Sequence, residues 1–560
     1  MQPSGWGSRC RPSCSDAKWQ PAPSQPTKDR NQRGVSLMTQ DEADVVVVGL
    51  GPVGITLCNL LAAAGVRVEG IDAADDVYAL PRAIGMDHEV MRIFQNIGAA
   101  EAVAAATGHY RPSEYRSADG TLLRRFESPA EPYPLAWPPY QTFLQPELER
   151  ALRANGKRFL NLALRTGTEL VGLENPERPV LTLRDKASGE CTRRTPRYVV
   201  GCDGANSFIR RRLGVALEDL DFDEPWLVVD MILEDQQAPL PGTNVQFCDP
   251  ARPHTYVCGP DQLRRWEFMI LPYEDPAEVN RPERIWQLLS PWLRPDQARL
   301  WRSATYNFHA LVAEQWRVGS VFLAGDACHM TPPFLAQGMV QGIKDAANLA
   351  WKLAHAIGSG SEHLLGTYQA ERRPFMREVI DITKRLGQFI CERDPDKAQA
   401  RDAEMAAAMR TGQGVQIRQN LFPPIRHGLV ASNIDGSPSP RAGEPCPQPW
   451  IIGPFGRKRL DDALPPGFQL LIAGDMDPSP TLLDKARQVG IAVHRVAQEK
   501  SCPSLLVEED RVLVDWLTAK GARAALVRPD HVVFGTAADT RGTEQLVCQL
   551  QMMLVAAPDK

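Results

Sequence analysis

The 560-residue chain lacks three patterns that would each indicate a particular class of protein. Its 63 Lys and Arg are outnumbered by 68 Asp and Glu, which excludes the basic field that drives nucleic-acid binding. Its 12 cysteines include no Cys-x-x-Cys pair, so we expect reduced, inert thiols rather than a dithiol centre. The longest apolar run, residues 45–68, is interrupted by four glycines and Pro52, so it does not predict a membrane span.

The N-terminal part of the chain also lacks the marks of a secretory signal. Residues 1–42 are rich in Pro, Ser, Gln and Arg and contain no apolar segment of the kind that a signal peptide needs. We therefore expect a disordered extension and a cytoplasmic protein. Met38 stands just before the first predicted strand, so Met1 and Met38 are both candidate translation starts.

Motifs for several common chemistries are missing as well. The sequence contains no P-loop and no Gly-x-Ser-x-Gly elbow. His309 and His329 are isolated, without further ligands at metal-binding spacing. We therefore predict no metal site.

A glycine-rich loop between a strand and a helix is the first positive signal. Residues 44–48 form a β-branched run typical of a buried parallel strand, and a Gly-x-Gly-x-x-Gly loop follows directly. The first glycine permits a tight turn, the second lets the backbone approach a pyrophosphate, and the third lets the helix pack closely. An acid placed 18 residues after the loop, at the end of a second strand, suits a ribose diol. The pattern predicts that a dinucleotide, either FAD or NAD, is bound by Gly49, Gly51, Pro52, Val53, Gly54 and Asp72.

Two later segments each combine a strand with a turn. Residues 198–210 contain an Asp203-Gly204 turn before a helix, and local physics alone favours a structural role there. Residues 321–329 form a buried strand ending in Gly325-Asp326, where an aspartate can accept a sugar hydroxyl. Two prolines follow, and the Gln337-Gly338-Met339 segment opens a long helix whose N-terminal N–H groups can face a carbonyl or an anionic ring.

Together these segments resemble the GxGxxG, DG and GD motifs of the single-component FAD-dependent aromatic hydroxylases, of the para-hydroxybenzoate and phenol hydroxylase type. The resemblance covers about residues 43–390. It places Arg82 near the FAD pyrophosphate and isoalloxazine, Gln145 near the ribose and phosphate, and Asp203, Asp326 and Pro333 among the flavin contacts. Segments 81–87, 249–253 and 264–269 are most similar to the 3-(3-hydroxyphenyl)propionate hydroxylases. Residues 335–337 and Cys328 depart from the family pattern, which leaves the substrate open.

The resemblance implies an α/β fold: a Rossmann-like FAD-binding domain, an interleaved mixed β-sheet substrate domain and a C-terminal thioredoxin-like domain. Within the last domain no Cys-x-x-Cys occurs, and Cys502 and Cys548 are far apart, so a packing or oligomerisation role fits better than dithiol chemistry. We place FAD-binding segments at 43–120, 140–222 and 296–420, substrate-domain segments at 121–139 and 223–295, and the C-terminal domain at 435–557.

The same resemblance implies the reaction and its partners. FAD is the cofactor, NADH or NADPH the co-substrate, and O₂, which adds at flavin carbon 4a, supplies the oxygen atom for a small phenolic acid. We expect a substrate similar to 3-(3-hydroxyphenyl)propionate or 3-hydroxycinnamate. A phenolate is more nucleophilic than a phenol, so a base near the ring hydroxyl is needed. The candidates for this base are His88, His254 and Tyr256, each of which could instead be an ordinary core or surface residue. Pro332 and Pro333 are expected to shape the loop beside the flavin's reactive edge.

Other functions stay open on the sequence. The protein could use FAD for halogenation or epoxidation, or could oxidise a polycyclic, polyketide-like substrate. The halogenase version is weak because no Trp-x-Trp-x-x-Ile-like segment occurs. A flavin-binding protein without turnover is a third hypothesis. The preference for NADH or NADPH, and whether the chain forms a homo-oligomer, are not determined by these patterns.

Overall fold

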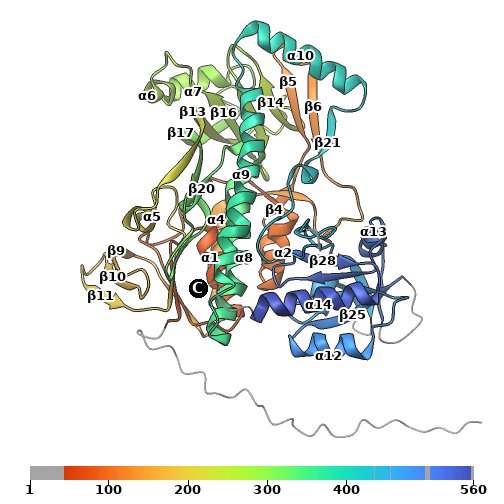
Figure 1. The fold of residues 1–560 in the computed structure, drawn as a ribbon. Helices are drawn as coiled ribbons and strands as arrows, with labels where there is room; N and C mark the ends of the chain where they lie inside the picture. Colours follow the sequence, from red (N-terminus) through yellow and green to blue (C-terminus); the bar gives the residue numbers. More distant parts are fainter. Residues whose placement is uncertain (1–42, 434–435, 454–455, 499–504, 556–560) are drawn as a thin grey trace, which may run out of the picture. The chain divides into compact units, whose positions relative to one another are not determined.

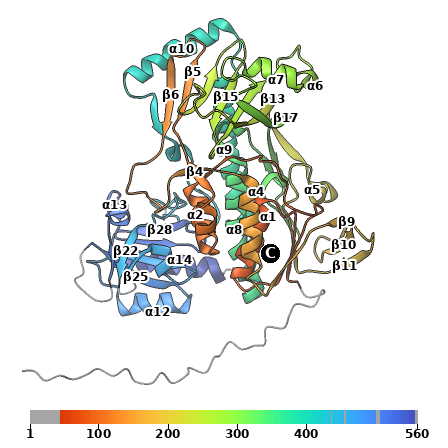
Figure 2. The same cartoon turned by 180° about the vertical axis from the view of Figure 1, so that it is seen from behind.

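The computed structural model describes residues 43–433, 436–453, 456–498 and 505–555. The predicted N-terminal extension, Met38 and Cys502 therefore lie outside the described residues. Figures 1 and 2 show the fold from opposite sides. Within the described ranges, no helix is both long and apolar enough to cross a membrane.

A six-stranded, mostly parallel sheet, called here the parallel sheet, carries the glycine-rich loop and the two later strand–turn segments. Its central strand β1 consists of four valines that are at most 7% exposed, as expected for a strand covered on both faces. Only the edge strand β18 pairs antiparallel. In sheet order the strands are β18 (Arg317–Val318), β19 (Val321–Leu323), β12 (Tyr198–Gly201), β1 (Val45–Val48), β2 (Val68–Ile71) and β8 (Leu162–Arg165).

Long helices pack beside this sheet and against one another. Helix α1 (Pro52–Ala63) follows the glycine-rich loop and contacts both α4 (Gln145–Gly156) and α8 (Gly338–Ser359); Figure 2 shows α1 and α4 side by side. A Cβ added at Gly342 of α8 would lie 2.6 Å from Val53 Cγ2, so this glycine permits the close approach of α8 to α1. Helix α9 (Leu365–Ile390) contacts α8 and also strands β14 and β17 of a second sheet (Figure 1).

That second sheet, called here the large sheet, has nine strands drawn from widely separated parts of the chain. In order they are β20 (His329–Met330), β17 (Ala298–Ala313), β13 (Leu217–Leu233), β16 (Leu263–Met269), β15 (His254–Cys258), β14 (Asn244–Cys248), β5 (Ser113–Ser117), β6 (Leu122–Glu127) and β21 (Val415–Ile417). Strands β5 and β17 belong to this sheet, although the predicted boundaries place their residues in FAD-binding segments. The domain boundaries otherwise stay predictions.

The remaining elements of this part of the chain include two small sheets. Strands β3, β7 and β4 form one small sheet, and β9 to β11 form another. The bounds are β3 (Gly85–Asp87), α2 (His88–Asn96), α3 (Ala100–Ala104), β4 (Thr107–His109), β7 (Tyr140–Phe143), β9 (Thr168–Glu174), β10 (Val180–Asp185), β11 (Cys191–Arg194), α5 (Phe208–Arg212), α6 (Pro276–Val279), α7 (Pro282–Leu289), α10 (Pro395–Arg410) and the 3₁₀ turns η1 (Gly325–Ala327), η2 (Pro333–Leu335) and η3 (Arg418–Leu421).

The C-terminal region forms a mixed sheet of seven strands with flanking helices. Strands β24, β25 and β26 are parallel, whereas β27 and β28 continue the sheet antiparallel. The thioredoxin-like assignment stays a prediction. The bounds are β22 (Trp450–Gly453), β23 (Gly456–Arg459), α11 (Leu460–Ala463), β24 (Gln469–Ala473), α12 (Pro480–Gln488), β25 (Ala492–Ala497), β26 (Leu505–Glu508), α13 (Val512–Thr518), β27 (Ala524–Val527), β28 (Val533–Ala537) and α14 (Thr540–Val555).

A buried charge cluster joins this region to α8 and α9. Arg528 and Glu371 are fully buried and form an ion pair of 2.8 Å, and the Lys352 ammonium lies 2.9 Å from the same Glu371 carboxylate. Arg528 also pairs with Asp530 at 2.6 Å, and Asn348 donates to that carboxylate at 3.2 Å. Since each buried charge has a partner, the cluster holds the C-terminal sheet against the helices that follow the Gly-Asp segment.

Candidate functional site

The glycine-rich loop has the geometry that its sequence predicts for close packing. Gly49 adopts φ +94°, and a Cβ there would lie 2.4 Å from the Cys202 carbonyl oxygen. At Gly54 a Cβ would lie 1.8 Å from the Gly49 oxygen, so only glycine lets helix α1 approach this closely. Gly51 differs, because nothing in the described chain lies within 4 Å of an added Cβ. The loop is therefore packed at both ends and open at its centre, next to the first N–H groups of α1.

Asp72 lies at the end of β2 and reaches back to this loop. Its carboxylate accepts hydrogen bonds from the backbone N–H of Leu50 at 2.7 Å and of Ala74 at 2.8 Å. The acid is thus held beside the glycine-rich loop, where a ribose bound next to the pyrophosphate would lie.

The Asp203-Gly204 segment lies directly behind the same loop. Gly204 adopts φ +78°, and the Asp203 carboxylate accepts the N–H of Ile209 at 3.1 Å through one oxygen. Its other oxygen, Oδ1, is buried without a hydrogen-bond partner in the structure. Arg210, in helix α5, donates to the Ala327 carbonyl at 3.0 Å and so ties this segment to the Gly-Asp turn.

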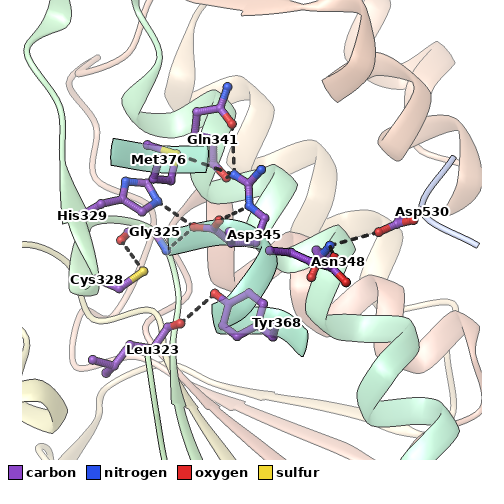
Figure 3. A network of polar contacts seen from close by, with 12 residues as sticks. Leu323, Gly325, Cys328, His329, Gln341, Asp345, Asn348, Tyr368, Met376 and Asp530 are labelled. Atoms are coloured by element: carbon purple, nitrogen blue, oxygen red, sulfur yellow. Dashed lines mark hydrogen bonds and ion pairs between the residues drawn. The ribbon is translucent and has the colours of Figure 1, made fainter. Parts of the chain in front are cut away.

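The Gly325-Asp326 turn is held by a buried network centred on Asp345 of α8 (Figure 3). The Asp345 carboxylate accepts from the Gly325 N–H at 3.1 Å, from His329 Nε2 at 2.7 Å and from Arg372 Nε at 2.7 Å. Burial alone would raise the pKa of Asp345, but Arg372 and His329 hold it below its usual value. The ligand atoms of Cys328, His329 and Asp345 lie close enough together that one cation could contact all three. The Asp345 carboxylate, however, already accepts hydrogen bonds from three donors. We therefore assign the cluster a structural role.

The residues after this turn lead into helix α8. Asp326 is exposed, and its side chain has no hydrogen bond or ion pair within the described residues. Gln337 is buried and accepts from Gln341 at 2.7 Å, immediately before the helix begins at Gly338. Ala336, at the position where the family pattern has glycine, adopts the left-handed conformation with φ +49°. At this departure from the family pattern, the fold therefore holds an alanine in a conformation that glycine adopts more easily.

Arg82 and Gln145, which only the family resemblance had singled out, lie together. The Gln145 amide oxygen accepts the backbone N–H groups of Arg82 at 3.2 Å and Ala83 at 2.8 Å. Its amide nitrogen donates to Glu149 at 2.8 Å. Gln145 thus positions the Arg82 segment, while the Arg82 side chain remains exposed and stacks over Tyr78 at 4.9 Å.

A cavity of about 230 Å³ separates these residues from the large sheet. We call it the sheet cavity. Arg82, Pro333, Gly338 and Met339 line one side of it, whereas Pro332 is buried and is not a lining residue. The opposite side is built from alternate residues of three strands, which share one face of the sheet: Asn244, Gln246, Thr255, Val257, Arg265 and Glu267.

Arg265 connects the large sheet to the Arg82 segment across the edge of this cavity. It forms a buried ion pair with Asp230 at 2.7 Å and donates to the carbonyl oxygens of Arg82 at 2.7 Å and Pro81 at 3.4 Å. The neighbouring Arg264 points away and bonds to the carbonyl oxygens of Asp261 and Leu263. The two adjacent arginines therefore face opposite sides of the sheet, as strand geometry requires.

The structure does not bring Tyr256 or His254 to the sheet cavity. Both lie on the other face of β15, in an apolar cluster with Trp266 and Phe268. His254 Nδ1 is hydrogen-bonded to the Arg252 carbonyl at 2.8 Å, and burial raises the pKa of Tyr256. Neither is therefore placed to act as a base in this cavity, because the period of two along β15 aims Thr255 at it instead.

His88 lies in a different cavity, of about 140 Å³, between α2, α8 and the C-terminal region. Its Nδ1 is buried and has no hydrogen-bond partner among the described residues, and burial lowers the pKa of the imidazole. Tyr140 and Arg418 line both cavities and form the wall between them. His88 is therefore separated from the sheet cavity by one layer of side chains.

Sequence reasoning missed the polar residues that do line the sheet cavity. Glu267 lies in segment 264–269, which the family resemblance had singled out, and strand alternation starting from Arg265 would have placed it on the same face. No sequence pattern pointed to Arg418, because its η3 segment follows the short strand β21 and contains no recognisable motif. It donates to the Tyr110 hydroxyl at 2.8 Å and stacks over Tyr140 at 4.3 Å.

The donor and acceptor groups of this region suit FAD. The open space at Gly51, beside the N-terminus of α1, suits a pyrophosphate, and the free Asp326 carboxylate suits a sugar or ribityl hydroxyl. The N-terminus of α8 offers unpaired N–H groups to a ring carbonyl at the edge of the sheet cavity. The buried Asp203 Oδ1 supplies a further acceptor without a partner.

Comparison with known proteins agrees with this geometry. The family model described as "FAD binding domain" matches residues 42–383, and that described as "HcaD C-terminal domain" matches residues 443–552. A probable NADH-specific resorcinol 4-hydroxylase of Rhodococcus jostii is 32% identical, covering 92% of this chain and 96% of its own length. A 3-(3-hydroxyphenyl)propionate/3-hydroxycinnamic acid hydroxylase of Burkholderia vietnamiensis is also 32% identical, covering 88% and 93%.

Solved structures show the same fold. The flavin-dependent monooxygenase PieE, in complex with FAD and substrate, superimposes with a TM-score of 0.77 at 21% identity, covering 92% of this chain and all of that one. Aklavinone-11 hydroxylase, with FAD and aklavinone, gives 0.72 at 22% identity, covering 92% and 99%. The predicted α/β class and FAD cofactor are confirmed, and the chain belongs to the single-component FAD-dependent aromatic hydroxylases.

Proposed function

We propose that this hydroxylase uses NADH and O₂ to hydroxylate a monocyclic phenol in the sheet cavity. The observation that carries the proposal is the composition of this cavity, whose two sides differ in kind. Predicted flavin-contacting residues line one side, and polar side chains of the large sheet line the other. At about 230 Å³ the cavity is below the roughly 300–1,000 Å³ typical of sites for drug-sized ligands, which favours a single ring.

The division of labour follows from this placement. Bound FAD, reduced by NADH, supplies the activation of O₂. The protein's own residues exclude water, orient the ring and accept the hydrogen of its hydroxyl. The overall reaction converts an aromatic C–H, O₂, NADH and a proton into an aromatic C–OH, NAD⁺ and water.

A phenolic acid such as 3-(3-hydroxyphenyl)propionate is the first candidate substrate, supported by the names of several relatives. Its carboxylate would need a cation. Arg265 already binds Asp230 and two carbonyl oxygens, whereas the buried Nε of Arg418 has no partner in the part of the chain that the structure describes. Arg418 is therefore the side chain best placed to bind a substrate carboxylate.

A neutral dihydroxybenzene such as resorcinol is the second candidate. A specific feature favours it: Glu267 faces the cavity and would repel a carboxylate but accept a hydroxyl. The relative named a probable NADH-specific resorcinol 4-hydroxylase supports the same class and the use of NADH.

The test is one panel of substrates with purified, flavin-loaded protein. NADH oxidation and O₂ uptake are measured with 3-(3-hydroxyphenyl)propionate, 3-hydroxycinnamate, resorcinol and, as a ring without a hydroxyl, benzoate. We expect a phenol to stimulate both rates and to yield a product heavier by one oxygen atom. NADH oxidation that no phenol changes, or that proceeds without an oxygenated product, would refute the proposal. A dependence on halide would instead indicate halogenation.

A further inference from the structure

Glu267 occupies a central place on the cavity face of the large sheet. Strand β16 lies between β13 and β15, and Glu267 is paired with Thr255 of β15 in the ladder. Thr255 in turn donates its hydroxyl to Gln246 at 2.6 Å. These three polar side chains form a row across the sheet, opposite the Pro333 and Met339 side of the cavity.

Within the described residues, no hydrogen bond or ion pair satisfies the Glu267 carboxylate. The cations nearest to it are engaged elsewhere, since Arg265 and Arg302 both pair with the buried Asp230, at 2.7 and 3.2 Å. From the other walls, Arg82, Tyr140 and Arg418 face the same cavity. A half-buried carboxylate that has no partner among the described residues and faces a cavity is suited to a ligand hydroxyl.

The environment also makes Glu267 a stronger base than an ordinary glutamate. Burial raises its pKa, Asp230 raises it further, and Arg265 and Arg302 oppose this only in part. The alternatives in the cavity, and Asp230 beside it, are weaker proton acceptors at neutral pH. Tyr140 is a phenol whose pKa burial raises further, and the Tyr110 hydroxyl is bonded to Ser113 and Arg418. The Asp230 carboxylate already forms ion pairs with the guanidinium groups of Arg265 and Arg302.

We propose that Glu267 is the catalytic base that accepts the ring-hydroxyl proton of the substrate, an inference that rests on the proposed hydroxylase function. The O–H bond of the phenol breaks, the proton goes to the Glu267 carboxylate, and the electron pair stays on the ring oxygen. This raises the electron density at the ortho and para carbons, one of which receives the oxygen atom. The proton returns when the new phenol forms, so Glu267 ends the cycle ionised.

The test uses Glu267→Gln, which keeps the size of the side chain and one acceptor oxygen but cannot take a proton. We expect kcat/KM for a phenol with an ordinary pKa to fall by about 100-fold or more, the lower end of what positioned general bases contribute. Glu267→Asp, which keeps the base on a shorter stem, should retain more activity than Glu267→Gln. The control is Glu234→Gln, an exposed carboxylate at the end of β13, which should leave kcat/KM unchanged.

A second substrate series separates proton transfer from mere positioning. Ring-fluorinated phenols that are already ionised at the assay pH need no base, so the loss in Glu267→Gln should shrink to within about threefold. FAD content and the thermal midpoint of each variant show whether it folds. A loss below threefold on ordinary phenols, or an equal loss on both series, would overturn the assignment of Glu267. If wild-type protein hydroxylates no phenol at all, the proposed function itself fails.

Discussion

The glycine at the open centre of the dinucleotide loop gives a direct test of how FAD is bound. In the structure a Cβ at Gly51 would meet nothing within 4 Å, and its backbone, at φ −66°, is one that alanine adopts freely. Gly51→Ala loses a favourable helix N-cap but restricts the unfolded chain, so we expect unfolding of the apoprotein to change by less than about 1 kcal/mol.

The affinity for FAD should respond very differently. If the pyrophosphate lies over Gly51, the new methyl group displaces it from the N–H groups at the start of α1. Losing one hydrogen bond to a charged group costs about 1.5–3 kcal/mol, or about 10- to 150-fold in Kd. The dissociation constant is measured by titrating apoprotein with FAD and following flavin fluorescence, and the apoprotein's thermal midpoint by circular dichroism.

Two other glycines serve as matched controls for this substitution. Gly49→Ala should impair both folding and FAD binding, because its Cβ would lie 2.4 Å from the Cys202 oxygen. Gly358→Ala, near the exposed end of α8, also meets nothing within 4 Å and should leave FAD affinity unchanged. If Gly51→Ala binds FAD within threefold of wild type while the apoprotein remains folded, the loop does not hold the pyrophosphate as argued.

Three further predictions concern other parts of the molecule. Glu371→Gln leaves Lys352 and Arg528 buried without their shared carboxylate, so chemical denaturation should show a loss of about 3–5 kcal/mol. Burial alone would raise the pKa of Glu371, but Arg528 and Lys352 lower it to about 2. The contribution of Glu371 to the free energy of unfolding is therefore complete above about pH 4.5 and is lost as the pH falls toward 2. This pH-dependent loss should be missing from the stability profile of the variant. Ala336→Gly relieves a left-handed alanine and should leave stability equal or up to about 1 kcal/mol higher in a thermal melt, whereas a clear loss would show that the strain argument is wrong. Tyr256→Phe should change kcat/KM by less than about threefold, because this side chain faces away from the cavity; a large loss would restore it as a candidate base.

Local patterns were sufficient to predict the elements that carry the proposed dinucleotide-binding residues. The strand, loop and helix at residues 45–63, and the helix beginning at Gly338, lie within a residue or two of where they were expected. Their signals are short-range: a β-branched run, glycines at required positions and a change of hydrophobic period. The family resemblance added Arg82 and Gln145, which lie far apart in sequence and meet only in the fold.

The substrate side could not be predicted to the same extent, because it depends on long-range pairing. The large sheet joins β5 to β14 across more than a hundred residues, and no local pattern specifies that register. Thr255 and Tyr256 are neighbours in sequence, so their side chains point to opposite faces of β15. The register of β15 in the sheet decides which of these faces is turned toward the cavity. Two of the three candidate bases, His254 and Tyr256, therefore fell on the face away from the sheet cavity, while Glu267 and Arg418 were overlooked.

Helix α8 connects the flavin side of the site to the C-terminal sheet. Its N-terminus lines the cavity at Gly338. Further along the helix, Asp345 accepts a hydrogen bond from Gly325 in the Gly-Asp turn (Figure 3). Asn348 and Lys352, nearer its other end, contact Glu371 in the buried cluster that includes Arg528. A rigid helix cannot shift at one end without disturbing the hydrogen bonds at the other. The C-terminal region contributes none of the described residues that line the sheet cavity. It nevertheless fixes the position of the N–H groups that we predict to face the flavin ring. Loosening the Glu371 cluster should consequently weaken FAD binding as well as stability, which the same Glu371→Gln variant can report by flavin titration.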